Sequence, residues 1–412
     1  MKPVVEADRV WRELDTLATF SDAEAPAVTR IVFTETDLRA RRFFKECCAA
    51  AGLSIREDPI GNTFARWQGS EADAPAVGTG SHIDAIPNAG KFDGTVGVFG
   101  GLEAIRALQS VGFAPRRSID VVLFTSEEPT RFGIGCLGSR LLSGALGDEA
   151  GERLRDTEGR TIDDVRRAAG FSGPLDAVRV GRDSYASFVE LHIEQGPLLE
   201  RSGRDIGIVT AIAAPASLRV FVEGQGGHAG AVLMPDRHDA FLAAAELALA
   251  VEAAARASGS PDTVGTVGVC ELFPGAINSI PSRVRIDVDV RDIDLGRRDG
   301  VLQALDVACH DVSRRRGVTV RIEPINADAP ATCAPAIVDA VAAACDGRGI
   351  KSQQMISRAY HDSLFMARVA PTGMIFIPCR GGISHRPDEY ASPGAIATGV
   401  AVLADTLAAL ST

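Results

Sequence analysis

The order of apolar and helical segments predicts an α/β fold with a parallel central sheet. PAVGTGSHID is typical of a strand that runs into a loop, DGTVGVFGGLEAIRALQSVG of a glycine-rich start followed by a helix, and SIDVVLFTSEE of a second strand. A strand, a helix and a strand at this spacing indicate a parallel βαβ unit. Functional groups in such sheets lie in the loops at the carboxyl ends of the strands.

The segments on either side extend this first domain. Residues 8–51 have helical spacing, residues 147–183 are charged and indicate a helical, solvated excursion, and YASFVELHIEQGPLLE indicates a strand that ends in a polar cluster. Near Ala213 the pattern changes to strand, alanine-rich helix, two strands, helix and strand, which predicts a small inserted α+β sandwich ending near Ala327. We therefore expect a catalytic domain formed by residues 1–212 and 328–412, with residues 213–327 inserted.

Composition limits the classes of function. A chain of 412 residues favours two or three domains, and a net charge of −11 disfavours nucleic acid and anionic membrane surfaces as partners. The eight cysteines form no CxxC pair, which argues against zinc-finger and redox motifs. Acids near the N-terminus argue against a signal peptide, and Glu246 and Glu252 interrupt the longest apolar-rich stretch. These features predict a cytoplasmic protein with reduced thiols and no membrane association.

The stretch GSHIDAIPNAGKFDG carries three candidate site residues. His82 and Asp84 are two positions apart, so on an extended strand they face the same way. A carboxylate at Asp84 could therefore hold the second ring nitrogen of a metal-binding His82. Asp93 follows between glycines, where the backbone can bend. Taken alone, the stretch is equally consistent with a solvated loop that contains a histidine by chance.

The adjacent acids Glu127 and Glu128 follow the apolar run VVLF. Two like charges at this spacing are unfavourable unless a positive charge lies nearby. A metal ion would supply it: one acid could bind the ion and the other could act as general base on a water molecule. The alternative is a pair of exposed loop acids, which costs little.

Two further histidines complete the pattern. His192 lies in ELHIEQG at a predicted strand end, and His385 lies in GGISHRPDEY, a glycine- and proline-rich loop. A lone histidine is more often structural, but the chain has only seven, and three of them lie in polar loops after apolar runs. Three imidazoles and two carboxylates are a suitable ligand set for two divalent ions.

Six ordered motifs make the resemblance specific. GSHID…FDG, EEPTRFG…GSR, ELHIEQGP, GQGGHAG, NSIP…DVR and ISHRPDEY, in this order, resemble the amidase, hydantoinase/carbamoylase family of dinuclear metallo-amidohydrolases. That family includes N-carbamoyl-L-amino-acid hydrolases, allantoate amidohydrolases, β-ureidopropionases and ureidoglycolate amidohydrolases. The resemblance covers residues 10 to 410 and implies a metallopeptidase-like catalytic domain with a mixed, mostly parallel sheet. It also implies that the inserted sandwich is a lid and dimerisation domain, and hence a homodimer.

The same resemblance implies the residue roles. Two divalent ions, manganese first and zinc, cobalt or nickel as alternatives, would be bound by Asp93 as the bridge, by His82 and His192 on one ion, and by Glu128 and His385 on the other. Glu127 would be the general base, and Asp84 would support His82. His228, in cis or across a dimer, would polarise the scissile carbonyl. Substrate contacts would come from Gln195, His228, Asn278 and Arg291.

Two stretches resemble those of ureidoglycolate amidohydrolases and narrow the expected substrate class. One is SRAYHDSLFMARVAPTGMIFIPC, and the other is GSHIDAIPNAGKFDG together with SEEPTRFGIGCLGSR. Arg358, Tyr360 and His361 would then line the pocket, and the bulk of Tyr360 would favour a short substrate. We therefore expect hydrolysis of a ureido or carbamoyl C–N bond next to a carboxylate, with ureidoglycolate first and an N-carbamoyl-L-amino acid or allantoate second.

Two other classes of function stay open at this point. An aminopeptidase or deacylase could use the same scaffold, although ELHIEQG and NSIP…DVR argue against it. A binding protein that keeps the fold and not the chemistry is the other alternative, because folds are widely reused.

Overall fold

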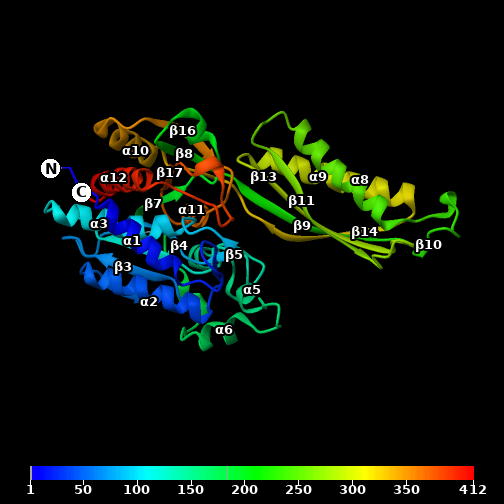
Figure 1. Cartoon of the computed structure of the whole chain (residues 1–412), viewed down its shortest axis with the longest axis horizontal. Coiled ribbons are helices and arrows are strands. Elements are labelled where there is room, and N and C mark those ends of the chain that lie inside the picture. The colour runs from blue at the N-terminus through cyan, green and yellow to red at the C-terminus, as the bar shows by residue number, and fades with distance from the viewer. Residues whose placement is uncertain (1, 183) are drawn as a thin grey trace. The chain divides into compact units, whose positions relative to one another are not determined.

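The computed structural model describes residues 2–182 and 184–412, which form two compact units (Figure 1). Unit 1 comprises the described residues up to Thr210 together with Thr332–Ser357 and His361–Thr412, and unit 2 comprises Ala211–Ala331 and Arg358–Tyr360. The predicted boundaries after residues 212 and 327, and the role of the inserted segment as a lid or dimerisation domain, stay predictions. Residues 1 and 183, which fall within predicted segments, lie outside the described residues.

Unit 1 is built from helices around one large sheet. Its helices are α1 (Ala7–Ala18), α2 (Glu35–Ala50), α3 (Thr95–Ser110), α4 (Leu137–Ser143), α5 (Asp148–Glu152), α6 (Ile162–Ala168), α7 (Leu198–Ser202), α10 (Pro335–Arg348), α11 (Asp362–Met366) and α12 (Pro393–Leu410), with the short 3-10 helices η1 (Leu175–Val178) and η3 (Arg380–Gly382). Its strands are β1 (Val28–Arg30), β2 (Ser54–Glu57), β3 (Thr63–Trp67), β4 (Ala76–His82), β5 (Ala85–Ala89), β6 (Ile119–Phe124), β7 (Tyr185–Ile193), β8 (Ile206–Ile212), β15 (Ala331–Thr332), β16 (Ser352–Ser357) and β17 (Thr372–Ile377).

The central sheet is mixed, with a parallel core. Its order is β15-β8-β17-β7-β4-β6-β3-β2, and β16 pairs with β8 at one side. The four strands β17, β7, β4 and β6 run parallel, whereas β8, β3 and β2 pair antiparallel at the flanks. The α/β fold with a mixed sheet that includes parallel strands is therefore confirmed, and the carboxyl ends of the four parallel strands lie along one edge.

Strands β4 and β6 are buried along their whole length because helices cover both faces of the sheet. On one face, α3 lies so close to the sheet that a Cβ on Gly101 would be 3.0 Å from the Thr79 side chain. On the other face, Val122 and Phe124 join a core cluster that includes Leu137 of α4 and Ile162 of α6. The small residues of α3 thus allow close packing of a helix on β-branched strands.

Two sequence predictions for unit 1 were wrong in detail. Residues 8–51 are not continuously helical, because β1 separates α1 from α2 and pairs antiparallel with β5. The charged segment 147–182 is helical, as predicted, but it is not a solvated excursion: Ile162 and Leu175 are buried in a core cluster. Most of its charged residues are exposed, whereas Arg166 and Asp156 are buried.

Unit 2 is an α+β sandwich of the predicted element order. Its elements are β9 (Ala214–Glu223), β10 (Gly227–His228), η2 (Met234–Asp236), α8 (Ala240–Ala257), β11 (Val264–Phe273), β12 (Ser279–Ile280), β13 (Arg283–Asp292), α9 (Leu295–Arg316) and β14 (Thr319–Ala327). An antiparallel sheet of order β11-β13-β9-β14 packs one face on α8 and α9. Burial alternates along β13, as expected for a sheet with one covered face.

The short segment Arg358–Tyr360 belongs to unit 2 although unit 1 residues precede and follow it. Arg358 Nη2 donates to Asp262 Oδ1 at 2.7 Å, and the Arg291 guanidinium lies 5.6 Å from the centre of the Tyr360 ring. These contacts place two residues of the predicted pocket, which the sequence assigned to the first domain, on the inserted unit.

Helix α12 is the one helix among the described residues that is long and apolar enough to cross a membrane by length and composition. Half of its apolar window is buried, and it packs against α1, α3, α10 and the sheet strands β7 and β17. Ile396, Val400 and Leu403 are fully buried in these contacts. α12 is therefore a core helix of unit 1, and its packing accounts for its apolar composition.

Candidate metal centre and active site

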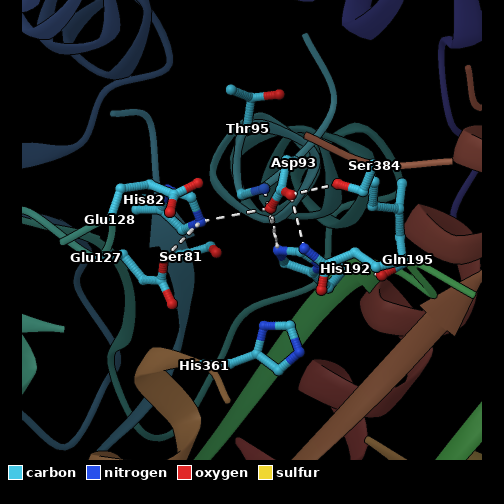
Figure 2. Close-up of polar contacts among 12 residues, drawn as sticks. Ser81, His82, Asp93, Thr95, Glu127, Glu128, His192, Gln195, His361 and Ser384 are labelled. Atoms are coloured by element: carbon cyan, nitrogen blue, oxygen red, sulfur yellow. Dashed lines mark hydrogen bonds and ion pairs between the residues drawn. The ribbon is translucent and has the colours of Figure 1, made fainter. Parts of the chain in front are cut away.

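The predicted metal ligands gather at the carboxyl ends of the parallel strands in unit 1. His82 is the last residue of β4, His192 lies near the end of β7, and Glu128 follows β6. Asp93 lies in the loop before α3, and His385 lies in the loop between η3 and α12. Figure 2 shows Asp93 facing His82 and His192, with Ser384 and Gln195 beside it.

Asp93 lies between two groups of ligand atoms. Its Oδ1 is 3.2 Å from His192 Nε2 and 3.7 Å from His82 Nε2. Its Oδ2 is 3.3 Å from His385 Nε2, which is also 3.3 Å from Glu128 Oε1. Two sets, His82–Asp93–His192 and Asp93–Glu128–His385, each have one atom per residue within 4.8 Å of the others. Asp93 is common to both sets, so the geometry suits two cations that share one carboxylate.

Hydrogen bonds orient the two buried imidazoles for this task. His82 Nδ1 lies 3.0 Å from the Asp84 carbonyl oxygen, and His192 Nδ1 lies 2.9 Å from the Ile193 carbonyl oxygen. A carbonyl can only accept, so each Nδ1 carries a proton, and Nε2 is the ring atom left to bind an ion beside Asp93. Oriented imidazoles of this kind are typical of metal-binding histidines.

Electrostatics of the centre also favour cations. Burial alone would lower the pKa of His82, but the carboxylates of Glu127 and Asp93 outweigh it and raise that pKa well above its ordinary value. Hydrogen bonds to Asp93 and Glu128 raise the pKa of His385 to about 11. The buried acids therefore attract positive charge strongly. The donor set of three imidazoles and two carboxylates, and the orientation of its buried imidazoles, fit borderline divalent ions.

Glycine at position 94 makes room for the centre. Its φ is +67°, a left-handed conformation that glycine adopts without strain, and a Cβ there would lie 2.4 Å from His82 Nε2. Its amide also donates to His192 Nε2 at 3.0 Å. The glycine after Asp93 thus allows the chain to pass directly against both histidines.

Glu127 lies beside the ligand sets and belongs to neither of them. Its Oε2 is 3.6 Å from His82 Nε2, and its Oε1 accepts from Cys136 Sγ at 3.4 Å. Burial raises the pKa of Glu127 well above its ordinary value, and the neighbouring acid Glu128 adds to this rise. A buried carboxylate with a raised pKa next to a metal centre is suited to accept and return a proton.

Asp84 supports the site in a way that the sequence did not predict. Its carboxylate was expected to hold the His82 ring, but the Asp84 main-chain carbonyl makes that bond and the carboxylate Oδ1 is 3.7 Å from Nδ1. The carboxylate instead accepts the main-chain amides of Glu127 at 3.2 Å and Glu128 at 3.0 Å. The Asp84 carboxylate therefore fixes the backbone of Glu127 and Glu128. It is too far from the His82 ring to form a hydrogen bond with it.

Gln195 was predicted as a substrate contact, and the structure places it against Asp93. Its Nε2 donates to Asp93 Oδ2 at 2.6 Å, its Oε1 is buried without a hydrogen-bond partner, and its φ is +55°. The strained backbone shows that the surrounding loop forces this position. A contact between Gln195 and a substrate stays a prediction.

His361 is the one predicted pocket residue that lies in unit 1. Its ring is buried, with its centre 4.4 Å from that of His192, and its Nε2 lies 3.0 Å from Ser357 Oγ. His361 also forms a candidate metal group with Glu190 and His192. It therefore lies directly beside the metal centre.

The remaining predicted substrate residues lie in unit 2. His228 is exposed on the small β10–β12 ribbon, and its Nδ1 accepts from the Gly230 amide at 3.1 Å. Asn278 is exposed just before β12. Arg291 donates to Asp289 Oδ1 at 2.6 Å, an ion pair between two residues of β13. Their roles toward a substrate stay predictions.

Sequence reasoning overlooked several residues that hold the site together. Ser81 donates to the buried Glu190 at 2.7 Å, Ser384 donates to Asp93 at 2.6 Å, and Glu389 accepts the Asp93 amide at 3.1 Å. Ser384 and Glu389 lie in ISHRPDEY, so the motif itself was the available signal. Cys136 carries no signal of this kind, because its contact with Glu127 depends on a left-handed backbone at φ +54°.

Comparisons with known proteins agree with this geometry. A model of the peptidase family M20/M25/M40 matches residues 78–409. The ureidoglycolate hydrolase of Oryza sativa subsp. japonica is 54% identical over 99% of this chain and 85% of its own length. The N-carbamoyl-L-amino acid amidohydrolase of Geobacillus stearothermophilus is 36% identical over 98% of both chains.

Solved structures give the same result. Crystal structures of AtUAH in complex with (S)-hydroxyglycine and with glyoxylate are each 52% identical, with a TM-score of 0.92 over 100% of this chain and 99% of the other. An amidase of the hydantoinase/carbamoylase family from Burkholderia multivorans is 34% identical, with a TM-score of 0.88 over 99% and 98% of the two chains. The resemblance found in the sequence is confirmed, and the chain belongs to the peptidase family M20/M25/M40, among its hydantoinase/carbamoylase-type amidohydrolases.

Proposed function

We propose that this protein is a metal-dependent amidohydrolase that cleaves the ureido C–N bond of ureidoglycolate. The observation that carries the proposal is the 54% identity to a ureidoglycolate hydrolase over 99% of the chain, against 36% for the carbamoylase of Geobacillus stearothermophilus. The ligands of the AtUAH structures also support it. Loss of the carbamoyl group from ureidoglycolate leaves hydroxyglycine, and loss of ammonia from hydroxyglycine leaves glyoxylate.

The residues divide the work as follows. Asp93 would be shared by two ions, His82 and His192 would bind one, and Glu128 and His385 would bind the other. Divalent ions at such a centre polarise a carbonyl and lower the pKa of water. Manganese is the ion that we propose, and zinc, cobalt or nickel suit the same donors.

Glu127 is the proposed proton carrier. Its carboxylate takes a proton from the water that attacks the ureido carbonyl, and it returns that proton to the departing nitrogen as ammonia leaves. Cys136 Sγ donates to the Glu127 carboxylate, and the Glu127 amide donates to Asp84, so both the side chain and the backbone of Glu127 are held for the two transfers. The carbamate that remains releases carbon dioxide.

Substrate recognition is assigned to charge and hydrogen-bonding groups. Arg291 offers a planar fork that suits a carboxylate, and Asn278 and Gln195 offer amide groups. His228 would donate to the oxygen that gains negative charge, a role in which one hydrogen bond matters greatly. Tyr360 and His361 would limit the length of the substrate. A homodimer and a cytoplasmic location are proposed with this function.

An N-carbamoyl-L-amino acid is the second candidate substrate, since carbamoylases are 35–36% identical over nearly the whole chain. It shares the ureido group and the carboxylate, and it differs by carrying a side chain in place of the hydroxyl. Allantoate carries two ureido groups, and the allantoate amidohydrolase of Bacillus subtilis is 32% identical.

The test is ammonia release by the Mn²⁺-loaded protein from a panel of substrates. The panel contains ureidoglycolate, allantoate and N-carbamoyl-L-alanine, each with and without chelator, and a dipeptide whose hydrolysis is followed by the release of free amino acids. We expect kcat/KM for ureidoglycolate to exceed the others by about 100-fold, the discrimination that a few pocket contacts provide. A higher kcat/KM for another substrate, or a rate that chelator leaves unchanged, would contradict the proposal.

A further inference from the structure

Two loops of unit 1 meet at the metal centre and contribute ligands from opposite ends of the chain. The loop of residues 90–94 carries Asp93, and the loop of residues 383–392 carries His385. Unlike His82 and His192, which lie on strands and are almost fully buried, the His385 side chain is 47% exposed and its φ is +59°. The loop of residues 383–392 must therefore be held in place by contacts other than strand pairing.

Glu389 makes those contacts. Its side chain is buried, its Oε1 accepts the amides of Phe92 at 2.7 Å and Asp93 at 3.1 Å, and its Oε2 lies 2.9 Å from Ser384 Oγ. Ser384 precedes His385 and also lies 2.6 Å from Asp93 Oδ2. One carboxylate thus bonds to both ligand-bearing loops.

The fit around Glu389 is close. A Cβ on Gly90 would lie 2.3 Å from the Glu389 Cβ and 2.5 Å from its Oε1, so only glycine at position 90 leaves room for this side chain. Next to Glu389, the ring of Tyr390 meets the ring of Phe92 edge-on, with centres 6.1 Å apart. Apolar packing and hydrogen bonds therefore join the same two loops.

We propose that Glu389 is a positioning residue that sets the distance between Asp93 and His385 and thereby the affinity of the ion held by Asp93, Glu128 and His385. This inference rests on the proposed function, in which two ions bind. The other set, His82–Asp93–His192, has two of its three ligands fixed on strands. Loss of Glu389 is thus expected to weaken the second ion selectively.

The chemistry of the contacts defines the informative variants. In Glu389→Gln, the amide oxygen can still accept both backbone amides, and the amide nitrogen can donate to Ser384, which in turn donates to Asp93. In Glu389→Ala all of these bonds are lost. In Glu389→Asp the charge remains, but the side chain is one methylene shorter and cannot reach both loops.

Asp58 offers a matched control in the same unit. It is buried, its Oδ1 accepts the amides of Ile60 at 3.1 Å and Asn62 at 2.9 Å, and its Oδ2 accepts from Asn62 Nδ2 at 2.8 Å. It contacts none of the proposed metal ligands in these bonds. Asp58→Ala therefore removes a loop-holding carboxylate of the same kind away from the metal centre.

The experiment measures Mn²⁺ bound per chain by equilibrium dialysis of the full chain against graded Mn²⁺. We expect two ions in the unaltered protein. We expect Glu389→Ala to weaken the second ion at least about tenfold, the loss typical of residues that orient metal ligands, while the first changes less than about threefold. Glu389→Asp should follow Glu389→Ala, and Glu389→Gln and Asp58→Ala should bind both ions like the unaltered protein.

A kinetic readout separates this role from a general defect. Because these variants are expected to bind the second ion more weakly, excess Mn²⁺ should restore most of the kcat of Glu389→Ala and Glu389→Asp. If Glu389→Ala does not fold, Glu389→Asp decides alone. The inference is overturned by normal binding of both ions in the Ala and Asp variants, by an equal loss in Asp58→Ala, or by a single ion in the unaltered protein.

Failure of the proposed function would look different. In that case the unaltered protein would release no ammonia from ureidoglycolate whatever its Mn²⁺ content, and the binding curves of the variants would still report on Glu389.

Discussion

The two units place their functional groups in contrasting surroundings. In unit 1 the ligands follow fully buried parallel strands, and a layer of hydrogen bonds from Asp84, Gln195 and Ser384 supports them. In unit 2 the strands alternate between buried and open positions, His228 and Asn278 are exposed, and Arg291 pairs with Asp289. The groups of the unit 1 centre are therefore held in place by their neighbours, whereas the proposed substrate residues His228 and Asn278 of unit 2 are exposed.

This difference predicts separate consequences for mutation. Changes at the metal centre of unit 1 should abolish turnover or metal binding, because its groups are held by hydrogen bonds to neighbouring residues and most of them are buried. Changes in unit 2 should alter KM and leave the metal centre unchanged.

The largest effect is expected for Glu127→Gln. Removal of the proton carrier should lower kcat by about 10²–10⁴-fold, the usual contribution of a general base, while the isosteric amide leaves bound Mn²⁺ unchanged. Ammonia release and Mn²⁺ content per chain check both parts. Full turnover in this variant would show that another group carries the proton.

Metal removal should affect unit 1 alone. An ion present at about 100 times its dissociation constant stabilises the folded state by about 2.7 kcal/mol, and chelator removes this contribution. Amide hydrogen exchange should therefore quicken in residues 82–94 and 383–390 and stay constant in β13. Equal acceleration in both units would mean that the metal centre also stabilises unit 2.

Arg291→Ala should raise KM about 10- to 100-fold with little change in kcat, because a hydrogen bond to a charged group contributes about 1.5–3 kcal/mol. Mn²⁺ content should not change. Asp289→Asn is the matched variant: it removes the internal carboxylate that now occupies Arg291, so KM should fall. A rise in KM for Asp289→Asn would instead indicate that Asp289 orients Arg291 for the substrate.

The smallest effect is expected for Arg358→Ala. The Arg358 side chain is 43% exposed and pairs with Asp262 at 2.7 Å, and such pairs contribute about 0–1 kcal/mol to stability. Denaturant unfolding should therefore change little, and KM should change less than that of Arg291→Ala. A tenfold or larger rise in KM would support the pocket position that the sequence predicted for Arg358.

The sequence by itself determined the α/β class, the parallel core, the order of elements in the inserted sandwich and the family. These follow from local pattern: apolar runs such as VVLF, alternation in SRVRIDVDV, and motifs whose residues are close in the chain. The hydrophobic periodicity of residues 147–182 did not predict that part of this segment is buried. Short helices with few apolar residues have the composition of a solvated segment, although their apolar residues pack into a core cluster.

Only the tertiary structure decided how the site is held together. The bond from the Asp84 carbonyl to His82, the contact of Cys136 with Glu127 and the link from Glu389 to Asp93 join residues by loop geometry or across up to 296 positions. The spacing of residues along the sequence does not predict such contacts. They depend on residues with a left-handed backbone, on positions such as Gly90 where a Cβ would not fit, and on which loops lie at the same edge of the sheet. Residue types can thus be read along the chain, but the partners of a buried polar group are set by packing in three dimensions.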